Sequence, residues 1–125
     1  MTNILTEEEK RKLYGWIRYH FLGLGANLET EEDLTTIKEL PLWDANIDIE
    51  KIPAELFKLK SVEKLNLSEN GIRKIPTKIS NLENLKILIF VMNKINKLPK
   101  SIFKIKNLEE LNLEANRLSK IPDEI

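Results

Sequence analysis

Asparagine and proline recur at a fixed interval through most of this chain. Each member of either series stands 23 residues after the one before it. The asparagine series is Asn70, Asn93 and Asn116, and the proline series is Pro53, Pro76, Pro99 and Pro122. A constant period of roughly 20–50 residues is typical of a stacked solenoid, in which each unit buries its apolar side only against its neighbours. The period therefore predicts a solenoid, a scaffold that mostly binds other molecules and seldom carries out chemistry.

Apolar residues keep the same phase as the asparagines. The pairs are Leu65-x-Leu67, Leu88-x-Phe90 and Leu111-x-Leu113. Alternate side chains of a strand face opposite ways, so these pairs predict one short strand per repeat with the apolar side chains inward. The asparagine that follows must turn a buried chain, and its amide can bond backbone groups that the bend leaves unpaired. We expect the stacked copies to form an asparagine ladder.

The second half of each repeat has a different spacing. Ile79, Leu82 and Leu85 stand three residues apart, which favours tight helical turns that pack back on the sheet. Pro76 precedes them, and proline suits the start of a helical turn because its φ is fixed and it has no N–H.

The whole pattern resembles the leucine-rich repeat family, in its 23-residue type with an "IPxxIxxL" second half. The resemblance covers roughly residues 34–125. It implies a right-handed α/β solenoid, a short horseshoe arc with about four parallel strands on its concave face and turns or short helices on its convex side. It also implies a module for protein–protein interaction, without catalysis.

Residues 1–33 lie outside the repeats and predict a helical cap, so we divide the chain into this cap and the repeats of residues 34–125. Thr6 and Glu9 have the spacing of a helix capping box, and we expect a helix over residues 7–22 that ends at Gly23 and Gly25. Its apolar side carries Leu13, Trp16, Ile17, His20, Phe21 and Leu24. Lys10, Arg11 and Arg18 fall largely on the other side. A second helical turn is expected at residues 30–33. The helix would cover the open end of the first repeat, as solenoids require for solubility.

The first and last repeats are irregular. The first is two residues longer than the others, with the insertion in residues 46–49, where we expect an irregular turn. The last stops in mid-repeat at Ile125, so nothing in the chain covers Leu111, Leu113, Leu118 and Ile121. A longer natural array, an end-to-end homodimer and a frayed last repeat each fit this open end.

Composition narrows the functional classes. Twenty acidic residues balance twenty basic ones, so no overall field attracts nucleic acid or a membrane. The sequence contains no cysteine, no signal peptide and no apolar run long enough to span a membrane. These features favour a cytoplasmic protein, although secretion by a non-classical route stays open. Six lysines and no acid occur in residues 84–108; they predict a solvated convex surface or the rim of a site for an acidic partner.

No enzyme, cofactor or metal site is predicted. His20 is the one histidine, and it has no partners at ligand spacing. Asp44, Asp48 and Glu50 alternate closely but match no calcium loop. We read all four as structural or solvated residues.

The third predicted strand departs from the pattern on its outer side. Its outward residues are Ile87, Ile89 and Val91, whereas the corresponding residues of the second strand are Lys64, Asn66 and Ser68, and those of the fourth are Glu110, Asn112 and Glu114. A clustered, exposed apolar patch usually marks an interaction site. The candidate partner-binding residues are Ile87, Ile89, Val91, Met92, Trp43, Asn66 and Asn112. Trp43 fits either this patch or the core beside the helix.

The most direct hypothesis is a protein or peptide ligand on the concave face. Two alternatives are a structural homodimer, formed through the apolar stripe or the open last repeat, and the recognition part of a larger bacterial effector or signalling protein.

Overall fold

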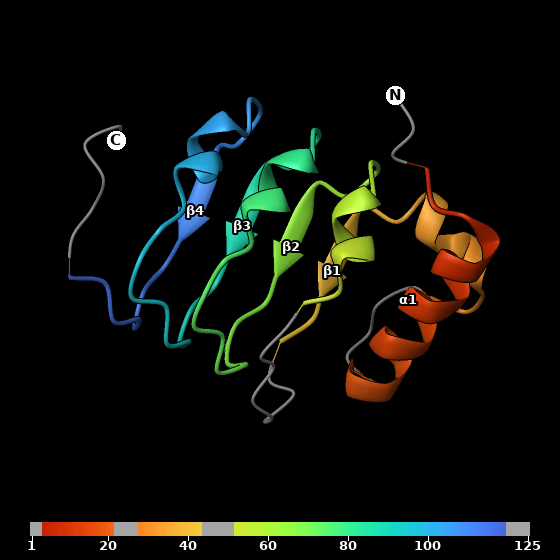
Figure 1. The fold of residues 1–125 in the computed structure, drawn as a ribbon, viewed down its shortest axis with the longest axis horizontal. Helices are drawn as coiled ribbons and strands as arrows, with labels where there is room; N and C mark the ends of the chain where they lie inside the picture. The colour runs from red at the N-terminus through yellow and green to blue at the C-terminus, as the bar shows by residue number, and fades with distance from the viewer. Residues whose placement is uncertain (1–3, 22–27, 44–51, 120–125) are drawn as a thin grey trace.

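The computed structural model describes residues 4–21, 28–43 and 52–119. They form one helix, four short 3₁₀ helices and a parallel sheet of four strands in the order β1-β2-β3-β4 (Figure 1). The strands are β1 (Glu39–Pro41), β2 (Lys64–Asn66), β3 (Ile87–Ile89) and β4 (Glu110–Asn112). The helices are α1 (Glu7–Phe21) and the 3₁₀ helices η1 (Glu31–Thr35), η2 (Ala54–Lys58), η3 (Thr77–Asn81) and η4 (Lys100–Lys104). The predicted repeat solenoid is confirmed.

The register of the sheet follows the repeat. Leu65 pairs with Leu88, and Leu88 pairs with Leu111. Leu40 pairs with Leu65 although the first repeat is longer. The central residue of β1, β2 and β3 is at most 1% exposed, whereas Leu111 in β4 is half-buried. The inner face of the sheet and the 3₁₀ helices enclose one continuous apolar core.

The 3₁₀ helices confirm the three-residue spacing predicted for the second half of each repeat. Pro53, Pro76 and Pro99 are the N-cap residues of η2, η3 and η4. The equivalent residues Leu56, Ile79 and Ile102 are buried in the core, and η2 also buries Phe57. η2 packs on η3 and η3 on η4, which forms the second layer of the solenoid (Figure 1).

The asparagine ladder is also confirmed, and its bonds cross from repeat to repeat. The Asn93 carboxamide oxygen accepts from the backbone N–H groups of Asn70 and Ile72, at 3.0 and 2.9 Å. Its amide nitrogen donates to the carbonyls of Leu67 and Phe90, at 2.9 and 3.0 Å. Asn116 repeats the arrangement one unit later, bonding the N–H of Ile95 and again the Phe90 carbonyl. Each asparagine thus satisfies backbone groups of two neighbouring turns.

The helix α1 lies beside the first repeat at the N-terminal end of the sheet (Figure 1). Its capping box is formed: the Glu9 N–H donates to the Thr6 hydroxyl at 3.1 Å, and the Thr6 N–H donates to the Glu9 carboxylate at 3.0 Å. Glu9 also pairs with Lys58 of η2 at 2.7 Å. The buried apolar residues of α1 are Leu13, Ile17 and Phe21, and the predicted helical turn after Thr30 is η1.

One expectation for α1 is wrong. The helical spacing predicts Lys10 away from the apolar side, but Lys10 is only 7% exposed. Its ammonium pairs with Glu7 and with Glu32 of η1, each at 2.8 Å. The pairing with Glu32, and then with Glu7, raises the pKa of Lys10 above its ordinary value. Helical periodicity misses this placement because the acidic partner comes from a separate element, while the aliphatic stem of a lysine can cover apolar surface.

Several sequence predictions fall outside the described residues. These are the helix stop at Gly23 and Gly25, the position of Leu24, the irregular turn at residues 46–49, and Ile121 with the end of the last repeat. The division of the chain into a cap of residues 1–33 and repeats from residue 34 stays a prediction.

Candidate functional site

The outer face of the sheet, called the concave face below, carries the residues that interrupt the repeat pattern. The strand register places Ile87 between Lys64 and Glu110. It places Ile89 between Asn66 and Asn112. An apolar strand therefore runs between two polar strands. We call Ile87, Ile89, Val91 and Met92 the β3 stripe.

The exposure of the stripe residues fits their outward position. Ile87, Ile89 and Val91 are half-buried, whereas Leu88 and Phe90, which alternate with them, are fully buried. Met92 is 55% exposed. Its backbone has a φ of 58°, in the left-handed region, as do Glu69 and Ala115 one repeat before and after it. The same tight turn thus recurs in three successive repeats, and after β3 it presents the Met92 side chain to solvent.

The other predicted site residues lie on either side of the stripe. Asn66 and Asn112 use their carboxamide oxygens to accept the N–H of the residue two positions later, Ser68 and Glu114, at 3.0 and 3.1 Å. Among the described residues, neither amide nitrogen donates a hydrogen bond. Trp43 is 37% exposed and is not a core residue.

Ser68 departs from the expected outward position. It is 7% exposed, and its hydroxyl accepts the backbone N–H of Val91 at 3.0 Å. The hydroxyl therefore links β2 to the end of the β3 stripe instead of facing a partner. Ser68 lies two residues beyond the end of β2, and its hydroxyl bonds the equivalent residue of the next repeat, so its burial goes with this contact.

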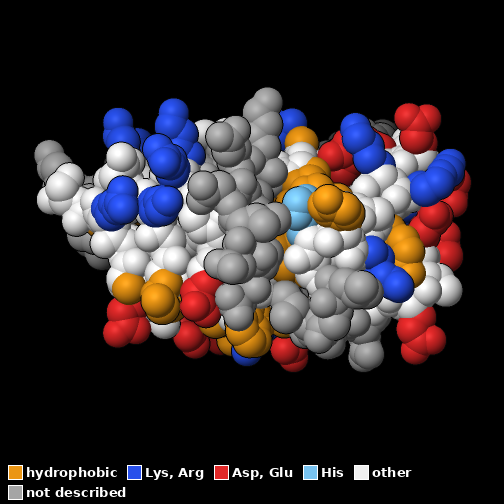
Figure 2. All heavy atoms as spheres, turned by 90° about the horizontal axis from the view of Figure 1, so that it is seen from below, with side chains coloured by type: hydrophobic (Ala, Val, Ile, Leu, Met, Phe, Trp, Pro, Cys, Tyr) orange, Lys and Arg blue, Asp and Glu red, His pale blue; other side chains and the backbone are white. Residues whose placement is uncertain are grey.

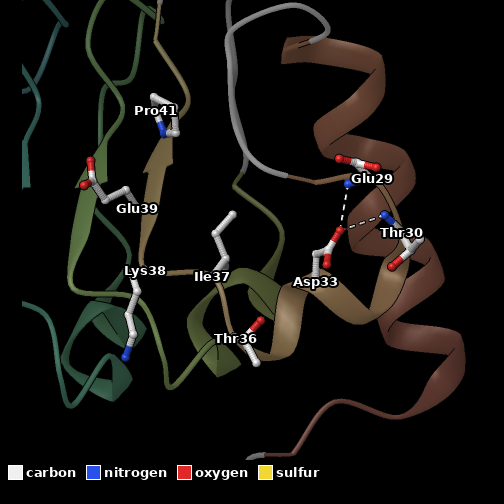
Figure 3. Close-up of a pocket in the computed structure, with 8 residues that line it drawn as sticks. All are labelled: Glu29, Thr30, Asp33, Thr36, Ile37, Lys38, Glu39 and Pro41. Atoms are coloured by element: carbon white, nitrogen blue, oxygen red, sulfur yellow. Dashed lines mark hydrogen bonds between the residues drawn. The ribbon is translucent and has the colours of Figure 1, made fainter.

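A pocket of about 840 Å³ lies at the N-terminal end of the concave face (Figure 3). Glu39 and Pro41 of β1 line one side, and Glu29 and Asp33 line the other. The Asp33 carboxylate accepts the N–H groups of Glu29 and Thr30, at 2.8 and 2.9 Å. The bond from Thr30, followed by that from Glu29, lowers the pKa of Asp33. Sequence reasoning missed this pocket, because it depends on how η1 lies beside β1.

The side chains of the described residues form no candidate metal site. Within these ranges, no three His, Asp or Glu side chains are grouped so that they could hold a metal ion. His20 lies among aromatic rings of its own helix, with its ring centroid 5.2 Å from that of Trp16 and 4.9 Å from that of Tyr19. No helix in the described part of the chain is long and apolar enough to cross a membrane.

Comparison with known proteins identifies the repeat. A model of the Leucine Rich Repeat family matches residues 61–82 and 107–125. Leucine-rich repeat-containing protein 7 of Rattus norvegicus and that of Mus musculus are each 43% identical to this chain over 51 residues. The chain carries leucine-rich repeats. Domains of this family are typical protein-interaction modules and are generally not enzymes.

Solved structures of leucine-rich-repeat proteins share the fold. A leucine-rich-repeat protein of Leptospira interrogans is 37% identical, covers 66% of this chain and has a TM-score of 0.61. An internalin of Listeria monocytogenes is 27% identical and covers 87% of this chain, with a TM-score of 0.65. The leucine-rich repeat domain of APL1B, at 22% identity and a TM-score of 0.59, shows the fold alone.

The matched proteins are longer than this leucine-rich-repeat chain. The matched segment spans 3% of each repeat-containing protein 7 sequence, 21% of the Leptospira chain and 31% of the internalin chain. What those whole proteins bind therefore carries over only as a proposal.

Proposed function

We propose that this protein is a non-catalytic binding module that holds a protein or peptide on its concave face, with the β3 stripe at the centre. The observation that carries the proposal is that β3 has apolar side chains at register positions where the neighbouring strands have polar ones. Ile89 stands where both neighbouring strands have asparagine, Asn66 and Asn112. The fold itself does not require an apolar residue at this position, since the adjacent strands form without one.

The surroundings of the stripe resemble the anatomy of a protein interface, in which an apolar centre is bordered by polar groups. Lys64 borders Ile87 on one side and Glu110 borders it on the other. Asn66 and Asn112 flank Ile89 with amide nitrogens that have no acceptor among the described residues. A partner main chain offers carbonyl oxygens that these amides can bond. Trp43, two residues after β1, is 37% exposed and so offers a further ring to a partner.

The contribution of the stripe follows from its partial exposure. Because Ile87 and Ile89 are already half-buried in the free protein, complete burial would contribute about 1 kcal/mol for each, at roughly 25 cal/mol per Å². Together they correspond to about a thirtyfold change in affinity. This is enough for an anchor, while the polar border provides orientation.

The test replaces the stripe with residues that the neighbouring strands already carry. The double variant Ile87→Lys/Ile89→Asn gives β3 the outer residues of β2 and should fold. Peptides would be selected on the wild type from a random library displayed on phage, synthesised, and measured against both proteins by calorimetry. We expect the double variant to lose about thirtyfold in affinity. A matched variant, Lys104→Gln on η4, should bind like the wild type.

Two results would count against the proposal. The first is that no peptide is enriched, or that enriched peptides bind both proteins equally. The second concerns self-association: sedimentation velocity that gives a wild-type dimer and a monomeric Ile89→Asn variant would assign the stripe to a second copy of the chain.

A further inference from the structure

The edge of the solenoid at which the strands end carries a concentration of positive charge. Figure 2 views the molecule from this edge: several lysine and arginine side chains lie together on its C-terminal half, with aspartate and glutamate side chains along the rim beside them. Residues 70–108 contain nine basic residues and a single acid, Glu83. Those in the turns between the asparagine ladder and the prolines, with the matching residue of the last repeat, are Arg73, Lys74, Lys94, Lys97 and Arg117. We call these five residues the basic edge.

The repeat stacks these charges on one another. Lys74 and Lys97 occupy equivalent positions in successive repeats, and so do Lys94 and Arg117. The backbone bonds that join the turns, from Lys94 N–H to the Ile72 carbonyl and from Arg117 N–H to the Ile95 carbonyl, are 2.8 and 2.9 Å long. Neighbouring repeats are about 4.8 Å apart, so like charges stand side by side, an arrangement that destabilises the fold slightly.

The opposite edge of the same molecule balances its charges. There Glu63 lies between Lys38 and Lys86, at 3.5 and 3.7 Å, and Lys60 pairs with Glu83 at 3.1 Å. On the basic edge, none of the ion pairs among the described residues involves Arg73, Lys74, Lys97 or Arg117. Those four side chains are exposed and contribute nothing to the core. The difference between the two edges therefore has no origin in folding stability.

We propose that the basic edge is a second binding surface, separate from the β3 stripe, and that it takes an acidic polypeptide segment. Successive carboxylates of such a segment can pair with the stacked cations. Three stacked turns span only about 10 Å, two spacings between repeats, which suits two or three carboxylates of a peptide better than a nucleic-acid duplex. Residues 70–79 and 93–99 contain no aromatic side chain on which the bases of a single strand could stack.

Fluorescence anisotropy with labelled decaglutamate tests the proposal. The wild type should bind the peptide at low salt and lose affinity as salt is added, because exposed charges are screened beyond about 8 Å at physiological ionic strength. Arg73→Glu/Lys97→Glu should lower the affinity about tenfold. The matched control, Lys104→Glu/Lys106→Glu, makes the same change of net charge in η4 and the turn after it, away from this edge, and should lower it less than about threefold.

Further variants and ligands distinguish binding at the basic edge from binding at the β3 stripe, from an effect of overall charge and from binding of other anionic ligands. Ile89→Asn should bind decaglutamate like the wild type, so failure of the concave-face proposal leaves this one standing. Equal losses in the two charge-reversed variants would reduce the effect to overall charge and overturn the proposal. So would absent binding of decaglutamate, or binding only of oligodeoxythymidine or of phosphatidylserine vesicles. Circular dichroism of each variant confirms that it is folded.

Discussion

Truncation of the central ladder residue, Asn93→Ala, should be among the most destabilising single changes outside the apolar core. Asn93 is 6% exposed and makes four close hydrogen bonds to backbone groups. The four bonds are not equivalent. The Leu67 carbonyl also accepts from the Asn70 amide at 3.1 Å, and the Phe90 carbonyl also accepts from Asn116 at 2.8 Å. Both carbonyls keep a donor when Asn93 is truncated.

The cost therefore comes from the two N–H groups. Asn70 and Ile72 are at most 2% exposed, and each N–H would lose the carboxamide oxygen that accepts it. An unsatisfied buried donor costs about 1–3 kcal/mol, so we expect Asn93→Ala to lower the free energy of unfolding by about 3–4 kcal/mol. Asn116 accepts one N–H, from Ile95, and its side chain is only half-buried. Water can replace it, so Asn116→Ala should cost about 1 kcal/mol.

Urea denaturation followed by circular dichroism measures both values. The midpoints should fall in the order wild type, Asn116→Ala, Asn93→Ala, with an unchanged dependence on urea concentration. Asn93→Asp keeps the shape of the side chain but replaces its donating NH₂ group with an oxygen. That oxygen would face the carbonyls of Leu67 and Phe90. The variant should be at least as destabilised as Asn93→Ala. Equal costs of about 1 kcal/mol at both positions would refute the argument that the ladder works by satisfying buried donors.

Three further predictions rest on equivalent positions and on the cap. Leu88→Ala should cost about 3–4 kcal/mol and Leu111→Ala about half of that, since the first side chain is fully buried and the second is half-buried; urea midpoints check the ratio. Met92→Gly should leave the midpoint nearly unchanged, because its left-handed φ of 58° suits glycine, whereas Met92→Val should lower the free energy of unfolding by about 1–2 kcal/mol. Hydrogen bonds from Lys58 and then from the Thr6 backbone lower the pKa of Glu9 below 4.5, so its stabilising effect is present above that pH and is lost as the pH falls through the folded-state pKa. Thermal melts of Glu9→Gln against pH should show a smaller loss on acidification than the wild type, and an equal loss in both would contradict the assignment.

Most of the fold could be predicted because the same sequence pattern, and with it the same local structure, recurs in each repeat. The period placed the strands, the asparagine turns and the 3₁₀ helices, and alternation placed Ile87 and Ile89 outside and Leu88 inside. The capping box of Thr6 and Glu9 was predicted from local spacing alone. These features depend on residues that are near in sequence or separated by one fixed step.

The features that the sequence did not predict arise between elements that are unrelated by the repeat. The burial of Lys10 depends on Glu32, which comes from η1. The pocket beside β1 depends on how η1 stands against the sheet. None of these has a period, so a single sequence holds no signal for them except local charge.

A repeat fold supplies its own comparison for each surface residue. In most proteins an exposed isoleucine has no internal reference, but here the residues at the same register as Ile89 are Asn66 and Asn112. The same reasoning applies to charge, since the edge with Glu63 is balanced and the edge with Lys97 is not. The scaffold accepts polar residues at the register of Ile89, and it accepts paired charges at the edge with Glu63. Folding therefore explains neither the apolar stripe nor the unbalanced charge of the basic edge. The two departures lie on different faces of the solenoid, so a partner that used both would have to wrap from the sheet onto the turns, with an apolar segment followed by an acidic one.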